Sequence, residues 1–121
     1  MTALETSLAF HHAWMAGDID TALKHVAEDV VCDAPAGRLT GAAAFRAFIE
    51  PFSQILTGSH LHAAFGDDTT AVLYYDTTTR PVPNAPAGEC HTVVDGLITH
   101  VRIVFDRTPF DAARAAAVTP G

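Results

Sequence analysis

Residues 88–106 read GECHTVVDGLITHVRIVFD, and this stretch decides the fold class. Within it, Asp95-Gly96 separates two runs that are rich in β-branched residues. An Asp-Gly pair supplies the two positive φ angles of a type I′ turn, which joins neighbouring antiparallel strands. The stretch therefore predicts a β-hairpin with strands at about 88–95 and 97–106.

Two more strands are expected before this hairpin. Apolar and polar residues alternate with a period close to two, which is the spacing of a half-buried strand. The strands are predicted at about 59–65 and 70–78, with a Gly-Asp-Asp turn at 66–68 between them. A proline-rich loop at 81–86 then leads into the hairpin, so the second half of the chain is predicted to form an antiparallel sheet.

The N-terminal region carries the signals of two helices. Thr2 and Glu5 have the spacing of a capping box, in which each side chain accepts a hydrogen bond from a free backbone N–H of the first turn. Gly17 suits the left-handed conformation in which many helices end. Asp18 can cap a second, short helix, so a helical hairpin is expected at the start of the chain.

Between these helices and the strands, the sequence predicts a short strand and a third helix. Val30-Val31-Cys32 is a β-branched run, and the segment at 33–37 closes it as a loop. The third helix is expected at 42–50, where Pro51 should kink or end it because proline lacks an N–H and clashes with the preceding turn. A last short helix is expected to begin near Thr108.

Helices followed by a run of antiparallel strands are typical of the α+β class. The length of 121 residues supports one hydrophobic core, so a single domain is expected over residues 1–121. The simplest arrangement folds a curved sheet around the third helix. It leaves a cone-shaped space between the sheet and the helices.

Composition argues against several classes of function. The net charge is −7, from 14 acidic and 7 basic residues without a Lys/Arg cluster, which disfavours nucleic acid as a partner. No apolar stretch is long enough to span a membrane and no signal peptide is evident, so a cytoplasmic location without a membrane partner is expected. Cys32 and Cys90 lack metal-site or redox spacing and are expected to be reduced. No phosphate-binding motif appears, and no cofactor is expected.

Several segments, in this order and spacing, resemble the nuclear transport factor 2-like domains. They are AGDID at 16–20, AEDVV at 27–31, PAG at 35–37, GAAAF at 41–45, VDGLI at 94–98 and VRIVFD at 101–106. The resemblance runs from about residue 4 to residue 110 and is closest to the branch of SnoaL-like polyketide cyclases and ketosteroid isomerases. It implies a conical, cystatin-like α+β barrel, commonly a homodimer through the outer face of the sheet. It does not imply one reaction, because the fold hosts isomerases, cyclases, dehydratases, hydrolases and binding proteins.

The three functional groups of the ketosteroid isomerases can be sought in this chain. The position of their helical Tyr falls on Phe10, and that of their late-strand Asp falls on Cys90. The position of their proton-transferring Asp falls on Ala34, or on Asp33 if the count slips by one. The steroid isomerase mechanism therefore does not carry over, although the fold does.

Three polar residues remain candidates for proton transfer. Asp33 beside apolar walls would be a base for a proton next to a carbonyl, whereas otherwise it orients the following turn. Asp76 lies in an otherwise apolar strand and would be a second base if it faces inwards, or an interface residue if it faces outwards. Tyr74, or alternatively a histidine, is the candidate hydrogen-bond donor to a developing oxyanion.

His60 and His62 alternate on a predicted strand and therefore share a face. Two imidazoles at this spacing can bind a metal ion. No third ligand is specified by spacing, so two half-exposed strand histidines are the favoured interpretation and no metal site is assigned.

The apolar residues predict the pocket better than the polar ones. A cone-shaped fold leaves a cavity, and such cavities are mostly apolar with few polar groups. The residues expected to contact a ligand there are Phe10, Trp14, Phe48, Phe52, Cys90, Val101 and Ile103.

Together these features predict a protein that binds or transforms a small, largely apolar carbonyl compound. If it is an enzyme, cofactor-free proton transfer of the isomerase, cyclase or dehydratase type is expected, with Asp33 or Asp76 as the base. The alternative is a ligand-binding or dimeric protein-interaction module without chemistry. The two hypotheses differ in whether a carboxylate lies inside a closed apolar cavity.

Overall fold

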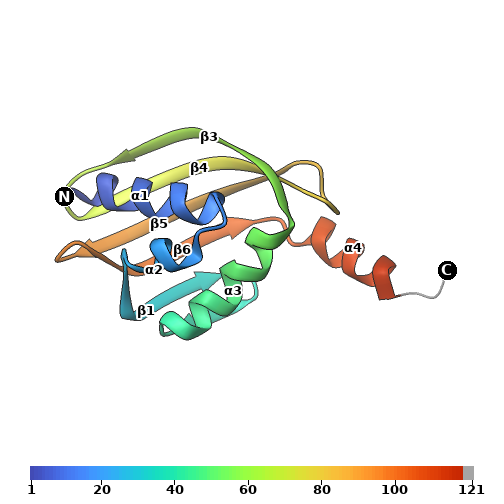
Figure 1. The fold of residues 1–121 in the computed structure, drawn as a ribbon, viewed down its shortest axis with the longest axis horizontal. Coiled ribbons are helices and arrows are strands. Elements are labelled where there is room, and N and C mark those ends of the chain that lie inside the picture. Colours follow the sequence, from blue (N-terminus) through green and yellow to red (C-terminus); the bar gives the residue numbers. More distant parts are fainter. Residues whose placement is uncertain (119–121) are drawn as a thin grey trace.

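A computed structural model describes residues 1–118 and shows an α+β fold of helices packed on one curved sheet (Figure 1). The helices are α1 (Ala3–Met15), α2 (Ile19–Leu23), α3 (Ala42–Ile55) and α4 (Thr108–Val118). The strands are β1 (Val26–Ala34), β2 (Gly37–Thr40), β3 (Leu56–Gly66), β4 (Thr70–Thr79), β5 (Ala85–Val94) and β6 (Leu97–Phe105). The class predicted from the sequence is confirmed.

The six strands form one sheet in the order β2-β1-β6-β5-β4-β3. β1 and β6 run parallel, and the other neighbouring pairs are antiparallel. Figure 1 shows α1, α2 and α3 over one face of this sheet, while α4 extends from one end of it. The hydrophobic core fills the space between that face and the helices, with Phe10, Leu73 and Ile98 fully buried in it.

Local sequence signals set the first two helices. The Thr2 hydroxyl accepts a hydrogen bond from the Glu5 N–H, and the Glu5 carboxylate accepts one from the Thr2 N–H, so the predicted capping box is present. Gly17, just after α1, has a φ of +83°, which glycine adopts without strain. The Asp18 carboxylate accepts a hydrogen bond from the Thr21 N–H and caps α2 as expected.

Of the two effects expected of Pro51, an end to the helix near residue 50 does not occur in α3. The helix continues to Ile55 with Pro51 inside it. Proline costs one backbone hydrogen bond there, but helices in proteins are stabilised mostly by the packing of their apolar face. Phe45 and Ile49 before the proline are buried, and Phe52 after it packs against Trp14, with 6.1 Å between the ring centres. That packing holds the last turn in place.

The strands are longer than the sequence predicted. The short strand expected at 30–32 is the nine-residue β1, and the loop expected after it contains a tight turn into β2 rather than a break. β3 begins at Leu56 and β5 at Ala85, three residues before the predicted starts of both. Apolar alternation is weak at these strand ends, and pairing with the neighbouring strands extends them.

The hairpin of β5 and β6 contains the predicted turn and one irregularity that the sequence did not reveal. Asp95 and Gly96 have φ angles of 52° and 77°, as a type I′ turn requires. The pairing register shifts by one residue between Thr92 and Val93, because β6 carries a bulge opposite them. This bulge determines which side chains of β5 face the core.

Candidate functional site

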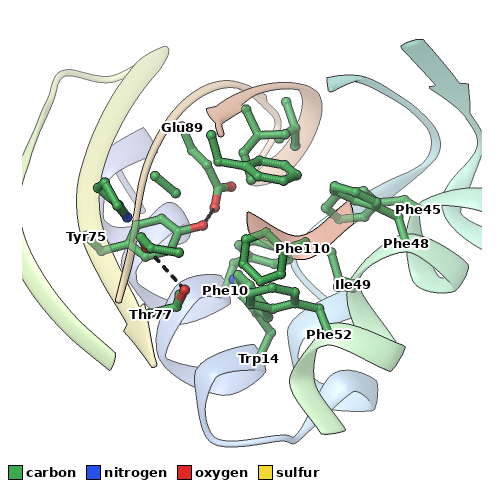
Figure 2. A pocket seen from close by; sticks show the side chains of 16 residues that line it. Phe10, Trp14, Phe45, Phe48, Ile49, Phe52, Tyr75, Thr77, Glu89 and Phe110 are labelled. Atoms are coloured by element: carbon green, nitrogen blue, oxygen red, sulfur yellow. Dashed lines mark hydrogen bonds between the residues drawn. The ribbon is translucent and has the colours of Figure 1, made fainter. Parts of the chain in front are cut away.

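The candidate site is a cavity of about 70 Å³ between α1, α3 and the inner face of the sheet (Figure 2). The volume is several times the roughly 10–15 Å³ that one water requires, so a small organic ligand fits better than one with several rings. Most of the lining is apolar. It consists of Phe10, Trp14, Phe45, Phe48, Ile49, Phe52, Tyr75, Thr77, Ala85, Pro86, Ala87, Glu89, Val101, Ile103, Phe105 and Phe110.

Aromatic rings form the walls of this cavity. Phe10 on α1 stacks on Phe45 of α3 with 5.8 Å between ring centres, so that the two helices meet at the cavity. Phe110, the third residue of α4, lies 5.6 Å from the ring of Phe52. Figure 2 shows these rings around one space, and Phe110 is the contribution of α4 to its boundary.

A buried hydrogen-bond network interrupts the apolar lining. The Tyr75 hydroxyl donates a hydrogen bond to Oε2 of Glu89, and Nε2 of His91 lies 2.9 Å from Oε1 of the same carboxylate. Because an ionised carboxylate only accepts, Nε2 carries the proton in this pair. Nδ1 of His91 lies 2.8 Å from Oγ of Ser7 on α1. The network fixes Glu89 with one partner on each carboxylate oxygen, and all four residues are buried.

The surroundings of Glu89 and Tyr75 determine their protonation. Burial, the largest influence, raises the pKa of the Glu89 carboxyl. The hydrogen bond from His91, the charge of His91 and the hydrogen bond from Tyr75 together outweigh burial and lower that pKa below its ordinary value. Burial, followed by the charge of Glu89, raises the pKa of Tyr75 well above its usual range. At neutral pH the network therefore contains a carboxylate acceptor and a neutral phenol donor.

His11 lies behind this network on α1. Its ring packs against the ring of Tyr75 with 4.7 Å between centres, and burial lowers its pKa to about 4. His11 is therefore neutral at neutral pH and adds no positive charge beside Glu89.

Three buried polar atoms have no hydrogen-bond partner within residues 1–118. They are Oγ1 of Thr6, Nδ1 of His11 and Nε1 of Trp14. Only Trp14 among the three lines the cavity. Because an unpaired buried donor costs about 1–3 kcal/mol, this indole N–H is a place where a ligand acceptor would be favourable.

Of the residues predicted to contact a ligand, six line the cavity and Cys90 does not. The six are Phe10, Trp14, Phe48, Phe52, Val101 and Ile103. A regular hairpin would pair Cys90 with Val101, which faces inwards. The bulge in β6 instead pairs His91 with Val101 and Glu89 with Ile103, so Cys90 lies on the outer face. The same one-residue slip hid Glu89 and His91 from the sequence interpretation.

The three predicted catalytic residues lie away from the cavity, which corrects their assignment to it. β4 directs Leu73, Tyr75 and Thr77 inwards, so Tyr74 and Asp76 between them face outwards. Asp76 accepts a hydrogen bond from Nε2 of His62 at 2.8 Å, and Tyr74 is half-exposed.

Asp33, the third of these residues, lies on β1 beside Arg38 and His100. Its Oδ1 is 2.8 Å from Nε of Arg38, and its Oδ2 is 2.7 Å from Nε2 of His100. The hydrogen bond from Arg38, then that from His100, hold the pKa of this carboxyl well below its usual range. Asp33 is therefore an ion-paired surface group and a poor proton acceptor.

His60 and His62 share the outer face of β3 as expected, with 4.6 Å between ring centres. Within residues 1–118, no three metal-ligating side chains come together. The free thiol of Cys32 is buried on β1, and burial raises its pKa to about 12.

The sequence interpretation did not assign the buried network to the site; its residues are Tyr75, Glu89, His91 and Ser7. One available signal was the alternation of Ala71, Leu73, Tyr75 and Thr77, which identifies the inner face of β4. Pairing across β4 and β5 then places Glu89 opposite Leu73, on the inner face. No residue pattern in the sequence predicts the bulge in β6 itself.

Comparison with known proteins defines the class. The fold is shared with crystal structures of the nuclear transport factor 2-like, or cystatin-like, kind. One is an NTF2-like protein of unknown function from Cytophaga hutchinsonii, with a TM-score of 0.77 and 20% identity over 92% of this chain and 96% of that one. Another is TerC co-crystallised with polyporic acid, with a TM-score of 0.70 and 20% identity over 90% of this chain and 95% of that one.

Within this class the family can be stated. The model of the SnoaL-like domain matches residues 8–101, and the chain belongs to that family. A crystal structure of a protein from Kribbella flavida has a TM-score of 0.93 and 63% identity, over 96% of each chain. Among curated proteins, none matches the chain. No helix in residues 1–118 is both long and apolar enough to cross a membrane.

Proposed function

We propose that the protein binds a small, largely apolar carbonyl compound in this cavity and moves a proton on it with Glu89. The observation that carries the proposal is a buried carboxylate, ionised at neutral pH, in the wall of an otherwise aromatic cavity. A carboxylate in such surroundings is a typical general base for a proton next to a carbonyl group. Glu89 takes the role that the sequence interpretation gave to Asp33 or Asp76.

The reaction needs no cofactor. Glu89 takes a proton from the carbon next to the carbonyl, and the electron pair of that C–H bond becomes the C=C bond of an enolate. The carbonyl π electrons move onto oxygen, which carries the negative charge. Glu89 then returns the proton to the same carbon or to another carbon of the conjugated system. The second case is an isomerisation, and atoms and charge balance in both.

The neighbours of Glu89 determine what substrate it can deprotonate. Tyr75 and His91 hold the two carboxylate oxygens, and Ser7 holds the imidazole of His91. This arrangement orients the carboxylate but also lowers its pKa, which makes it a weak base. The substrate must therefore carry an activated C–H bond, as in a β-keto ester or an enone.

One relative supports a small organic ligand. TerC, which shares the fold, was co-crystallised with polyporic acid. At 20% identity this likeness extends to the fold, and the present cavity of about 70 Å³ favours a smaller ligand.

The test is solvent deuterium exchange. A panel of cyclic ketones, β-keto esters and enones is incubated with the protein in deuterated buffer at neutral pH, and deuteration beside the carbonyl is followed by NMR. The wild type is expected to exceed the protein-free rate, and Glu89→Gln to lower that excess at least about a hundredfold. Asp76→Asn, which removes a carboxylate of the outer face, is the matched control and should retain it. Equal rates in wild type and Glu89→Gln would refute the catalytic role.

One observation favours a second function, binding without chemistry. Each oxygen of Glu89 already accepts a hydrogen bond from a buried side chain, and in this second function the carboxylate joins β4 to β5 without reacting with the ligand. A wild type that binds members of the panel but exchanges no proton would establish this function instead.

We also propose that a second copy of the chain covers the outer face of the sheet. Tyr74 and Val104 are 49% and 60% exposed, and they flank Gly88 in a shallow groove across β4, β5 and β6. The groove is apolar, and a two-fold contact between copies places the same patch of both chains together, so that each apolar patch covers the other. Light scattering should give a dimer for the wild type and a monomer for Val104→Asp. A monomeric wild type would refute this part.

A further inference from the structure

Trp14 lines the cavity and carries a buried hydrogen-bond donor that has no partner within residues 1–118. The side chain is 4% exposed, and the unpaired atom is Nε1. An indole N–H can only donate, so the group that completes this position must be an acceptor. The donor is held in place, because Phe52 and Tyr75 pack against the indole at 6.1 and 6.5 Å.

The other polar groups in the wall are already engaged. The Tyr75 hydroxyl donates to Glu89, and the Thr77 hydroxyl donates to the carbonyl oxygen of Ala85. Among the lining residues, Trp14 therefore supplies the free donor of the cavity.

Charge restricts the acceptor further. The lining contains the Glu89 carboxylate and no Lys, Arg or His side chain. A ligand anion would lie against this carboxylate, while the His91 imidazole that pairs with it does not line the cavity, and charge repulsion is weakly screened in surroundings of low polarity. A neutral acceptor, such as a ketone oxygen, meets no such penalty.

Trp14 and Glu89 both line this one small cavity. The indole of Trp14 stands nearly perpendicular to the ring of Tyr75, and the hydroxyl of that same Tyr75 reaches Glu89 (Figure 2). A ligand that fills the cavity can contact both residues, and a single ring is small enough to place its oxygen at the indole.

We propose that Trp14 is the residue that receives the acceptor oxygen of the ligand, and that the cavity selects neutral monocyclic carbonyl compounds over hydrocarbons and carboxylates of the same shape. The inference rests on the cavity being the ligand site of the proposed function. It does not depend on proton transfer by Glu89. During proton transfer, the same N–H would hydrogen-bond the enolate oxygen.

Three matched probes test the selection. Cyclohexanone carries an acceptor, methylenecyclohexane replaces that oxygen by a CH2 group, and cyclohexanecarboxylate adds a negative charge. Affinities are measured by calorimetry or ligand-observed NMR. The wild type should bind cyclohexanone about fivefold more tightly than methylenecyclohexane, the value of one hydrogen bond of ordinary strength, and the carboxylate least. In Trp14→Phe the ratio of the two affinities should fall to about one, with methylenecyclohexane still bound.

A second measurement on the wild type does not depend on the variant folding. Trp14 is the one tryptophan of the chain, so the indole N–H gives a single resonance in a nitrogen-correlated NMR spectrum. Cyclohexanone should move this proton resonance downfield as a hydrogen bond forms, and methylenecyclohexane should not.

The outcomes separate this inference from the proposed chemistry. Equal affinity for the ketone and the alkene, an unmoved indole resonance with the ketone bound, or an undiminished preference in Trp14→Phe would each overturn it. A ketone preference in a protein that catalyses no deuterium exchange would support Trp14 and refute the role of Glu89 as a base. Failure of both ring compounds to bind would overturn both proposals.

Discussion

Replacing His91 with leucine tests how the protein holds a charged carboxylate in its core. His91→Leu removes one of the two partners of the Glu89 carboxylate and leaves the other, Tyr75. It also takes from the Ser7 hydroxyl its imidazole partner. Breaking a buried ion pair or charged hydrogen bond on one side typically costs about 3–5 kcal/mol, so the free energy of unfolding should fall by that amount.

The same substitution should reverse how Glu89 contributes to stability as pH changes. In the wild type the folded-state pKa of Glu89 lies below its ordinary value. Its contribution is therefore present above the ordinary Glu range and is lost as pH falls through the folded-state pKa. Without His91, burial remains as the largest influence and raises that pKa above the ordinary value. The contribution of Glu89 in His91→Leu is then present at low pH and lost as pH rises through the raised pKa.

The assay is urea unfolding from about pH 3 to pH 8 for four proteins: wild type, His91→Leu, Glu89→Gln and the double variant. Subtracting the stability of Glu89→Gln from that of the wild type, and that of the double variant from that of His91→Leu, isolates the titration of Glu89 in each background. The double variant should be less destabilised than the sum of the single ones. If the Glu89 contribution to the free energy of unfolding changes with pH in the same direction in the wild-type and His91→Leu backgrounds, the reasoning is refuted. A loss of stability below about 1 kcal/mol, which is typical of a surface pair, would refute it as well.

Two further predictions concern the boundary of the cavity and the thiols. Phe110→Ala removes the ring that α4 packs on Phe52 at the boundary of the cavity. Ligand dissociation, measured by stopped flow, should become several-fold faster while the fold is retained. An unchanged dissociation rate would place the ligand entrance elsewhere. A thiol reagent should modify the partly exposed Cys90 of the native protein and reach Cys32 only after unfolding, because Cys32 is buried and that burial raises its pKa to about 12. Two thiols reacting at equal rates in the native protein would contradict this.

Much of the fold was predictable because its signals are local. The capping box of Thr2 and Glu5, the Asp18 cap and the Asp95-Gly96 turn each act within a few residues, and each is present. Their effects do not depend on the rest of the molecule. The class of the fold followed from the order of helices and strands, and this order also follows from local patterns.

The features that the sequence did not predict depend on contacts between distant residues. Pro51 remains inside α3 because the aromatic face of the helix packs onto α1, a contact that no local rule contains. The β6 bulge has no glycine to mark it, and it reversed the facing of Cys90 and Glu89. An acidic residue also looks like a surface residue until its partners are known, and the partners of Glu89 come from β4, β5 and α1.

The measurement closest to the central claim is the ionisation of Glu89 inside the cavity. Carbon NMR of the protein labelled at its glutamate carboxyls, with the Glu89 signal assigned by its loss in Glu89→Gln, follows this one group through a pH titration. We predict that Glu89 is ionised at neutral pH, titrates below the ordinary glutamate value, and shifts its resonance when cyclohexanone occupies the cavity. A carboxyl that is protonated at neutral pH, or that does not respond to the bound ketone, would contradict a charged base in the ligand site.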